Sequence, residues 1–447
     1  MSVSLPVNER RLRDRVSFAA LLREVGGLME EVSSLAQEPT TPAFAVAVTS
    51  LDNLTMTWAH VAPPLGTDAR DESLGGAGAD PDAEHAWIRA VSEGAERYCC
   101  MVYHDRDFIT ASASELGSAA LDLRTLPHCS PREYADPDCP LRPPDSRQPI
   151  RWVRGFSLID QCERLVPAIM THLYLRSLPA ERFWQPITTG VAAHTSLATA
   201  LNAAICEQIE RDAIALTWLA RLPLPRIEIE EPIAAVLAPN YARLRKSLVR
   251  QYFFDATTDV GVPTVYAVQL LDGHPTLGQY VNCATDFDAA TACAKTIREA
   301  APARAVFQMP RRIPEDVNQF ASLYDGAAYM GRPEQRRGFD FLVRSTSIKP
   351  LSAVRVDAPD GDAPRMRFLL ERLAAVGTDA IAVDLTTEEV RDAGLWVVRV
   401  VTPGLQPMST IHRARFLGHR RLYEYPRRAG FGRLTEDAVN AAPQPFA

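Results

Sequence analysis

The sequence lacks the features that would place it at a membrane or in the commonest phosphate-binding folds. No apolar run approaches the roughly 18 residues that a membrane-spanning helix needs. The N-terminal segment has no apolar stretch of the signal-peptide kind, and the phosphate-loop pattern GxxxxGK[ST] does not occur. We therefore expect a cytoplasmic protein that has no membrane partner.

An excess of positive charge and paired cysteines are also missing. The formal net charge is -7, and an acidic chain is poorly suited to bind the phosphates of nucleic acid. The eight cysteines include no CxxC pair, and Cys99 and Cys100 are adjacent. This usage is typical of reduced thiols, so we expect no nucleic-acid partner and no disulfide framework.

The patterns that are present mix helices with strands. Apolar residues that recur every three to four positions predict helices, and short apolar or alternating runs predict strands. Residues 62–82, 104–150 and 188–194 are rich in turn-forming or small residues and are expected to be loops or turns. Helices are expected at residues 8–37, 84–103, 197–222, 233–248, 288–301 and 366–376, and strands at residues 44–48, 150–155, 165–170, 262–271, 380–385 and 395–401.

This mixture predicts an α/β protein. The chain has 447 residues, of which 47% are hydrophobic, so it can bury a large core. No linker is long enough to separate two independent domains. We predict a small N-terminal region of residues 1–65 and one large domain of residues 66–447.

The most informative stretch lies in the helix expected at residues 197–222. Glu207, Glu210 and Arg211 are spaced i, i+3, i+4, which places them on one helix face. Two stacked carboxylates repel each other unless a cation lies between them. Mg²⁺ prefers oxygen ligands and often shares them with phosphates, and an arginine can hold a phosphate in fork geometry.

The same pattern occurs a second time. Glu93, Glu96 and Arg97 repeat Glu-x-x-Glu-Arg in the helix expected at residues 84–103. One copy alone is ordinary composition for a solvated helix face. Two copies in similar surroundings indicate two pseudo-equivalent halves that bring their acidic helices to one site.

Other polar residues have simpler interpretations. The arginines of residues 413–428 are expected on a solvated edge, with contact to a phosphate or an acidic peptide as the alternative. His172 and His194 are not spaced as a metal pair. They are expected to pack or to form hydrogen bonds within the fold.

Around these motifs the sequence resembles the YcaO family, and within it the stand-alone cyclodehydratase component of thiazole/oxazole-modified peptide pathways. The resemblance covers roughly residues 70–447. The resembling segments are residues 90–98, 151–155, 188–226, 400–407 and 417–430. The most specific parts are the run from Gly190 to Pro223, and Val401-Thr-Pro-Gly-Leu-Gln-Pro407 followed by Gly418-His-Arg-Arg-Leu-Tyr423. It implies a YcaO fold of mixed sheets, whose pseudo-twofold halves bring the acidic helices to one ATP site.

The resemblance also implies a reaction. A Cys, Ser or Thr side chain of a ribosomally made precursor peptide attacks the preceding carbonyl, and the former amide oxygen is phosphorylated by ATP. Phosphate then leaves, and a thiazoline or oxazoline ring remains. Phosphorylation is needed because an amide-derived oxygen is a poor leaving group, and catalysis is largely positioning and charge neutralisation.

The resemblance assigns roles residue by residue. It implies that Mg²⁺ is held by Glu93, Glu96, Glu207 and Glu210. It implies that ATP is bound by these four residues with Arg97, Arg211, Glu299 and Arg304. The C-terminal proline-rich tail, here Pro443, Pro445 and Ala447, is implied to reach the reacting groups.

The chain also departs from the family pattern. Ala77 stands where the family has Lys, Arg89 where it has Ser, and Pro302 where it has Gln. Thr188-Thr189 replaces Ser-Asn, and Ala447 replaces the last proline of Pro-x-Pro-x-Pro. The changes remove a phosphate-binding cation and several polar ligands but leave the acidic residues.

Two classes of function therefore stay open. One is an ATP-dependent enzyme that forms azolines or, as an alternative, thioamides. The other is a YcaO-fold pseudoenzyme that binds substrate or a catalytic partner. The partners implied are a precursor peptide and a separate leader-binding protein, with a flavin dehydrogenase, a second YcaO protein and a homodimer left open.

Overall fold

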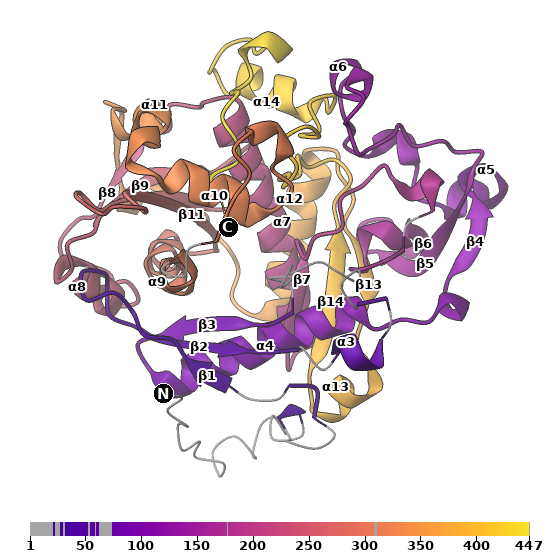
Figure 1. Cartoon of the computed structure of the whole chain (residues 1–447), viewed down its shortest axis with the longest axis horizontal. Coiled ribbons are helices and arrows are strands. Elements are labelled where there is room, and N and C mark those ends of the chain that lie inside the picture. Colours follow the sequence, from indigo (N-terminus) through magenta and orange to yellow (C-terminus); the bar gives the residue numbers. More distant parts are fainter. Residues whose placement is uncertain are drawn as a thin grey trace.

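The computed structural model describes residues 21–22, 27–29, 32–51, 54–58, 60–61, 74–176, 178–307 and 311–446. In this part of the chain the strands form three separate sheets, with orders β1-β2-β3, β11-β10-β9-β8-β12 and β4-β5-β13-β14-β7, the last joined by β6 on β5 (Figure 1). Pairing is antiparallel except between β8 and β12. The strands are β1 Val32–Ser34, β2 Ala45–Thr49, β3 Ala77–Asp80, β4 Ile109–Ser112, β5 Pro149–Ser157, β6 Cys162–Pro167, β7 Val191–His194, β8 Arg226–Glu228, β9 Arg250–Asp255, β10 Thr264–Leu270, β11 Gln279–Thr285, β12 Ile348–Pro350, β13 Ile381–Asp384 and β14 Trp396–Val401.

Three long helices connect the sheets. Each follows an edge strand of a different sheet: α4 follows β3, α7 follows β7 and α9 follows β11. The α-helices of the described residues are α3 Leu54–Thr57, α4 Ala83–Met101, α5 Ala113–Leu116, α6 Pro131–Ala135, α7 Leu197–Leu219, α8 Ala238–Arg245, α9 Ala289–Phe307, α10 Leu323–Gly331, α11 Asp340–Val343, α12 Asp362–Ala375, α13 Glu388–Asp392 and α14 Arg421–Arg428.

The three strand–helix units form a closed ring. Helix α4 packs on β3 and also on β7, α7 packs on β7 and β11, and α9 packs on β11 and returns to β3. Figure 1 shows α9 nearly end-on between β11 and β3, with α4 below and α7 beside it. Three edge strands and three helices therefore surround one central region.

Local sequence explains where two of these helices begin. The side chain of Asp82 accepts hydrogen bonds from the N–H groups of Glu84 and His85 at the start of α4, and Ser196 caps α7 in the same way through Thr199. Pro223 and Pro225 follow α7 and prevent its continuation.

Most expected elements are confirmed by the structure, including the two acidic helices. The strand expected at residues 165–170 ends earlier, at Pro167, and continues as a 3-10 turn. The helix expected at residues 233–248 is reduced to α8, and α9 continues past Pro302 to Phe307. The tertiary packing of these segments therefore overrides their apolar periodicity at the ends.

Four expectations were wrong. Strand β4 and helices α5 and α6 lie inside residues 104–150, which are expected to be loops or turns. Residues 32–34 belong to strand β1 and not to the helix expected at residues 8–37, of which residues 8–20, 23–26 and 30–31 lie outside the described residues. Strand β3 lies inside the loop expected at residues 62–82, and β7 inside the turn expected at residues 188–194. The small residues serve close packing here, because a Cβ on Gly78 would come within 2.2 Å of the Ala86 carbonyl oxygen of α4.

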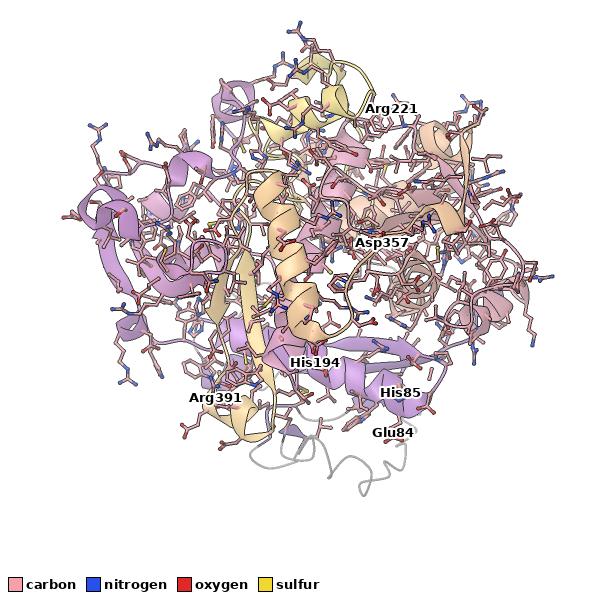
Figure 2. The ribbon with its side chains drawn as sticks, turned by 180° about the vertical axis from the view of Figure 1, so that it is seen from behind. Glu84, His85, His194, Arg221, Asp357 and Arg391 are labelled. Atoms are coloured by element: carbon pink, nitrogen blue, oxygen red, sulfur yellow. The ribbon has the colours of Figure 1, made fainter. Side chains whose placement is uncertain are left out.

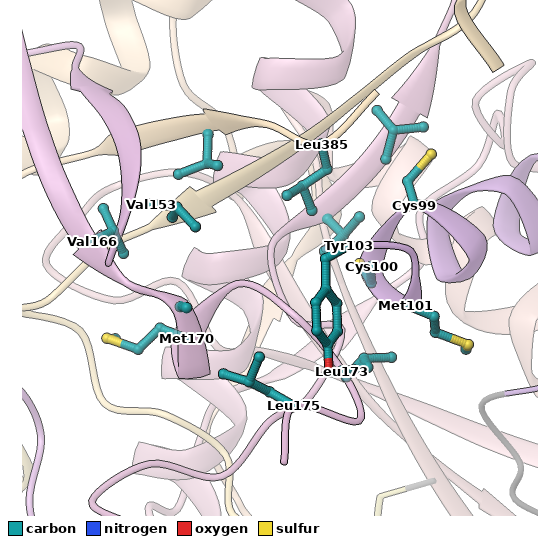
Figure 3. Packing of buried hydrophobic residues seen from close by; sticks show 14 of the residues in the cluster. Cys99, Cys100, Met101, Tyr103, Val153, Val166, Met170, Leu173, Leu175 and Leu385 are labelled. Carbon is teal, nitrogen blue, oxygen red and sulfur yellow. The ribbon is translucent and has the colours of Figure 1, made fainter. Parts of the chain in front are cut away.

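The largest apolar cluster lies under the C-terminal half of α4. Figure 3 shows part of this cluster, in which Cys99, Cys100 and Met101 of α4 lie near Val153 of β5, Val166 of β6 and Leu385, the residue after β13. All eight cysteines are free. No helix of the described residues is long and apolar enough to cross a membrane.

The small first sheet spans the boundary that we predict at residue 65. Strands β1 and β2 lie before it and β3 lies after it, and Val46 of β2 pairs with Ala79 of β3. The division into residues 1–65 and 66–447 stays a prediction, as does the pseudo-twofold relation of the halves.

Candidate functional site

The first acidic motif lies on α4 beside its own strand. The Glu93 carboxylate accepts a hydrogen bond from the backbone N–H of Ala77 at 2.7 Å. Its other oxygen is 2.8 Å from the Arg97 guanidinium, one turn along the helix. Ala77 N–H lies on the free edge of β3, so Glu93 satisfies a donor that no neighbouring strand can reach.

The second motif repeats this arrangement on α7. Glu207 accepts from the N–H of Gly190, directly before β7, at 2.9 Å. Arg211 lies 3.2 Å from Glu207 and 2.8 Å from Glu210. In both motifs the first glutamate therefore binds the start of the strand before its own helix.

The second glutamate of each motif reaches across to the next sheet. Glu96 of α4 accepts from the N–H of Ala193 in β7 at 2.7 Å. Glu210 of α7 accepts from the N–H of Thr285 in β11 at 3.1 Å. The four predicted metal ligands thus join the edge strands of all three sheets at the centre of the ring.

Burial and mutual repulsion perturb these carboxyl groups. Burial, followed by the charge of Glu93, raises the pKa of Glu96 well above its usual range, and Glu207 adds to this effect. Burial also raises the pKa of Glu210 to about 7, with Arg211 acting in the opposite direction and Glu299 and Glu207 reinforcing the rise. The glutamates of three helices therefore share one electrostatic site, which is typical of functional centres.

The third helix contributes differently. Glu93, Glu207 and Glu299 are each the eleventh residue of their helices. The fourteenth residue is Glu96 in α4 and Glu210 in α7, but Pro302 in α9. The carboxylate that would link α9 to β3 is therefore missing.

Arg304 of α9 is almost completely buried, with 2% of the residue exposed. Its side chain donates from Nε to Gln269 at 2.7 Å and lies over the Tyr280 ring, and burial lowers its pKa to about 10. Both Nη atoms are enclosed without a partner among the described residues. Its contact with nucleotide stays a prediction.

The C-terminal tail runs along α7 toward the acidic cluster. The Trp218 indole of α7 donates to the Ala442 carbonyl at 3.2 Å. Phe446 is buried and contacts the Tyr266 ring edge-on, with 5.2 Å between the ring centres. Pro443 and Pro445 are thereby fixed beside the core, while Ala447 lies outside the described residues.

We expected the arginines of residues 413–428 to lie on a solvated edge, and for Arg421 this expectation was wrong. Arg421 is buried and forms a two-point ion pair with Asp212 of α7, in which both distances are 2.7 Å. It also contacts Asp259 at 2.7 Å. Only part of the segment is exposed, because Arg421 anchors α14 on α7.

The two histidines have structural roles, as expected. His172 is buried against Tyr103 and Phe108, and burial lowers its pKa to about 4. His194 lies at the end of β7, below the long central helix of Figure 2, and its ring accepts from the Ser196 N–H at 3.0 Å. It therefore helps to shape the turn that starts α7.

The donor chemistry of the acidic cluster fits Mg²⁺. Carboxylate oxygens are the ligands that this ion prefers, and a bound cation would favour the ionised forms of Glu96 and Glu210, which burial disfavours. Among the described residues, however, no three acidic, histidine or cysteine side chains already converge on one point. The carboxylates would have to turn away from their N–H and arginine partners to coordinate a metal.

Sequence reasoning identified the acidic residues but missed their backbone partners. The N–H groups of Ala77, Gly190, Ala193 and Thr285 carry no side-chain signal. It also missed Arg399 of β14, which lies within an apolar alternating run. Only the strand order reveals that these groups meet.

Two curated relatives share this chain's sequence over much of its length. A Rhizobium leguminosarum bv. trifolii protein, described as an uncharacterized protein in the tfuA 3' region, is 26% identical over 65% of this chain and 66% of its own. An uncharacterized protein of Methanothermobacter thermautotrophicus is 25% identical over 81% of this chain and 89% of its own.

Solved structures show the same fold. A heterocyclase in complex with substrate and cofactor has a TM-score of 0.77 at 21% identity, covering all of this chain but only 59% of its own. YcaO from Methanopyrus kandleri, bound with AMPPCP and Mg²⁺, has a TM-score of 0.62 at 16% identity, covering 90% of this chain and 92% of its own. The E. coli microcin synthetase McbBCD complex contains a chain with a TM-score of 0.58 at 16% identity, covering 83% of this chain and 88% of its own.

The family model supplies the assignment. The model described as YcaO cyclodehydratase, ATP- and Mg²⁺-binding, matches residues 54–406. This range includes all three helices of the ring and every acidic residue described above. The fold, the acidic motifs and this match agree, and the chain belongs to the YcaO family.

Proposed function

We propose that this chain is an ATP-dependent cyclodehydratase that forms azoline rings in a ribosomally made peptide. One observation carries the proposal: two Glu-x-x-Glu-Arg motifs meet at one centre, where burial and repulsion leave the carboxyl groups short of positive charge. A divalent cation with a polyphosphate is the ligand that supplies this charge and also uses the arginines.

The residues divide into two tasks. Glu93, Glu96, Glu207 and Glu210 would hold Mg²⁺, which neutralises phosphate charge when it is bound. Arg97 and Arg211 already contact the first glutamate of each motif. With these carboxylates bound to a metal, both guanidinium groups would be available to hold phosphate oxygens.

The tail would hold the peptide side of the site. Phe446 packs on Tyr266 of β10, which lies directly opposite Cys283 of β11. Cys283 is two residues before Thr285, whose N–H group donates to Glu210. The chain end therefore lies one layer of side chains from the acidic cluster, which supports roles for Pro443, Pro445 and Ala447 in positioning the reacting amide.

The test is ring formation in a precursor peptide that carries its leader segment, with a leader-binding protein present. Each ring removes one water, so the peptide mass falls by about one water per ring. We expect this loss with Mg²⁺ and ATP and no loss with EDTA. Complete cyclisation by the isolated chain would contradict the need for a separate leader-binding protein.

Truncation tests the tail. Removing residues 443–447 should reduce ring formation far more than it weakens ATP binding. Because the truncation also removes the buried Phe446 side chain, Phe446→Leu is the matched control: it keeps apolar burial and should keep most of the yield. An unchanged yield in the truncated protein would remove the azoline-former from first place.

Pro302 and Ala77 favour one second candidate, a pseudoenzyme. Pro302 leaves α9 without the polar side chain that α4 and α7 carry at the same position, and Ala77 offers only its backbone N–H. A pseudoenzyme would bind a precursor peptide or a catalytic partner and would not turn over ATP. In that case truncation of the tail would change complex formation alone.

A further inference from the structure

Arg399 is a buried arginine that has no carboxylate partner. Arg399 is 3% exposed and lies in β14, which has β13 on one side and β7 on the other. Among the described residues its side chain makes one hydrogen bond, from Nη1 to the Ile187 carbonyl oxygen at 2.7 Å. Nε is enclosed without a partner among the described residues, so most of the five donors of this guanidinium are unused.

The strand register places Arg399 close to the two backbone N–H groups of the β7 region that bind candidate metal ligands. Arg399 lies directly opposite Val191 of β7. Gly190, one residue before Val191, donates to Glu207, and Ala193, two residues after it, donates to Glu96. Arg399 is thus next to the part of the ring where α4 and α7 meet.

The side chain of Arg399 points to the α4 side of the sheet. Val397 and Val401, its neighbours in the alternating pattern, pack in the cluster beneath α4, while Val398 and Val400 pack with α7. Burial lowers the pKa of Arg399, and the charges of Cys100 and Glu207 act against this change. Burial raises the pKa of Cys100, and the charge of Arg399 acts against this rise. Burial lowers the pKa of His172, and the charge of Arg399 adds to this effect.

A cation in this position needs an anion. Burying an unpaired charge is costly, and hydrogen bonds to a neutral carbonyl compensate only part of that cost. Arg97 and Arg211 are paired with glutamates of their own helices, whereas no carboxylate of the described residues lies within ion-pair distance of Arg399. A metal bound at Glu207 would also cancel the one carboxylate charge that favours the charged arginine.

We infer that Arg399 binds a phosphate oxyanion that arrives with the metal at the α4–α7 side of the ring. A guanidinium suits this ligand because its fork matches two phosphate oxygens. The oxyanion has two sources, the terminal phosphate of ATP and the inorganic phosphate left after transfer. The inference rests on the proposed function, since it assumes that Mg²⁺ and ATP occupy the ring.

The test is calorimetric titration of the full chain with ATP, ADP, AMP and inorganic phosphate, each with Mg²⁺. In Arg399→Gln we expect ATP affinity to fall by about 10- to 100-fold, the range for a charged hydrogen bond, and AMP affinity to stay within about twofold. Arg399→Lys keeps the charge but loses the fork, so its ATP affinity should fall by less. A matching loss for inorganic phosphate identifies the product as a second ligand, and a loss for ATP alone identifies the nucleotide phosphate.

Arg243→Gln is the matched control. Arg243 also donates to backbone carbonyl oxygens, of Ala43 and Pro239, but belongs to α8, which is not one of the three helices of the ring. This variant should bind all four ligands as the unmodified chain does.

Equal losses for ATP, ADP and AMP would show that Arg399 only positions the loop at Ile187, and would overturn the inference while leaving the proposed function intact. If Arg399→Gln does not fold, the ATP-to-AMP ratio of Arg399→Lys decides in the same way. An unmodified chain that binds none of the nucleotides would overturn the proposed function, and the inference with it.

Discussion

Helices α7 and α9 hold equivalent places in the ring but do different work. Each follows the edge strand of a sheet and packs on the next one. Helix α7 uses Glu210 to reach Thr285 of the next strand, whereas α9 has Pro302 at the same helical position. The fold therefore needs a helix at this place but does not need a carboxylate at its fourteenth residue. This difference indicates that Glu96 and Glu210 serve ligand binding and not folding.

The largest effect is expected from changing the acidic motif of α7. Glu207→Gln removes a candidate ligand charge but keeps an acceptor for the Gly190 N–H. We expect ATP turnover to fall by about 100-fold or more, the scale of losing one preorganised electrostatic contact, with an unchanged fold by circular dichroism. Glu371→Gln on the exposed face of α12 is the control and should keep full activity. A Glu207→Gln enzyme with normal turnover would show that the ligands lie elsewhere.

Measuring Mg²⁺-dependent ATP binding should test directly whether the glutamates of α7 and α9 differ in function. We expect Glu210→Gln to weaken Mg²⁺-dependent ATP binding by at least about tenfold and Glu299→Gln by less, because Glu299 is 48% exposed and already paired with Arg298. Titration of ATP with and without Mg²⁺ measures both effects. Tight ATP binding in EDTA, or a larger loss for Glu299→Gln, would invert the comparison.

The raised pKa of Glu210 predicts how stability depends on pH. Because this pKa is about 7 in the folded chain and 4.5 in the reference state, the folded state holds a proton between these values that the unfolded state has released. This contribution to stability is present at low pH and is lost as the pH rises through 7.

Glu210→Gln should therefore gain stability relative to the unmodified chain as the pH rises from 5 to 8. The gain in the free energy of unfolding should be about 1–3 kcal/mol, measured by denaturant unfolding in EDTA. Mg²⁺ should reverse the order at pH 8, since it stabilises only the chain that keeps the carboxylate. A gain that is equal at both pH values would assign the effect to packing.

The smallest effect is expected from Pro302→Gln. Proline in a helix interior removes one backbone hydrogen bond and crowds the preceding turn. We expect the free energy of unfolding to rise by about 1 kcal/mol and the ATP affinity to rise by a few fold, because an amide returns to the α9 position that faces the ring. A lower melting temperature would show that the bend at Pro302 is part of the packing on β3.

The sequence was sufficient to predict the contacts of the site that form within a single helix. Glu93 with Arg97 and Glu207 with Arg211 are i, i+4 pairs, and helical spacing alone predicts that each pair meets. The edge strands β3 and β7 were missed because each has only four residues, of which two are alanine, so they carry no apolar alternation. Arg421 was misassigned to a solvated edge since its partner Asp212 lies about two hundred positions away in the chain.

The free edges of β3, β7 and β11 have a consequence for solubility. An uncovered strand edge presents N–H groups that another chain can pair with, which leads to aggregation. Here Glu93, Glu96 and Glu210 occupy edge donors at Ala77, Ala193 and Thr285. Helices α9, α4 and α7 pack against β3, β7 and β11, so these edges are covered inside the ring and are closed to another chain. When the carboxylates turn to a metal, the N–H groups that they release therefore face the bound ligand and not a second protein.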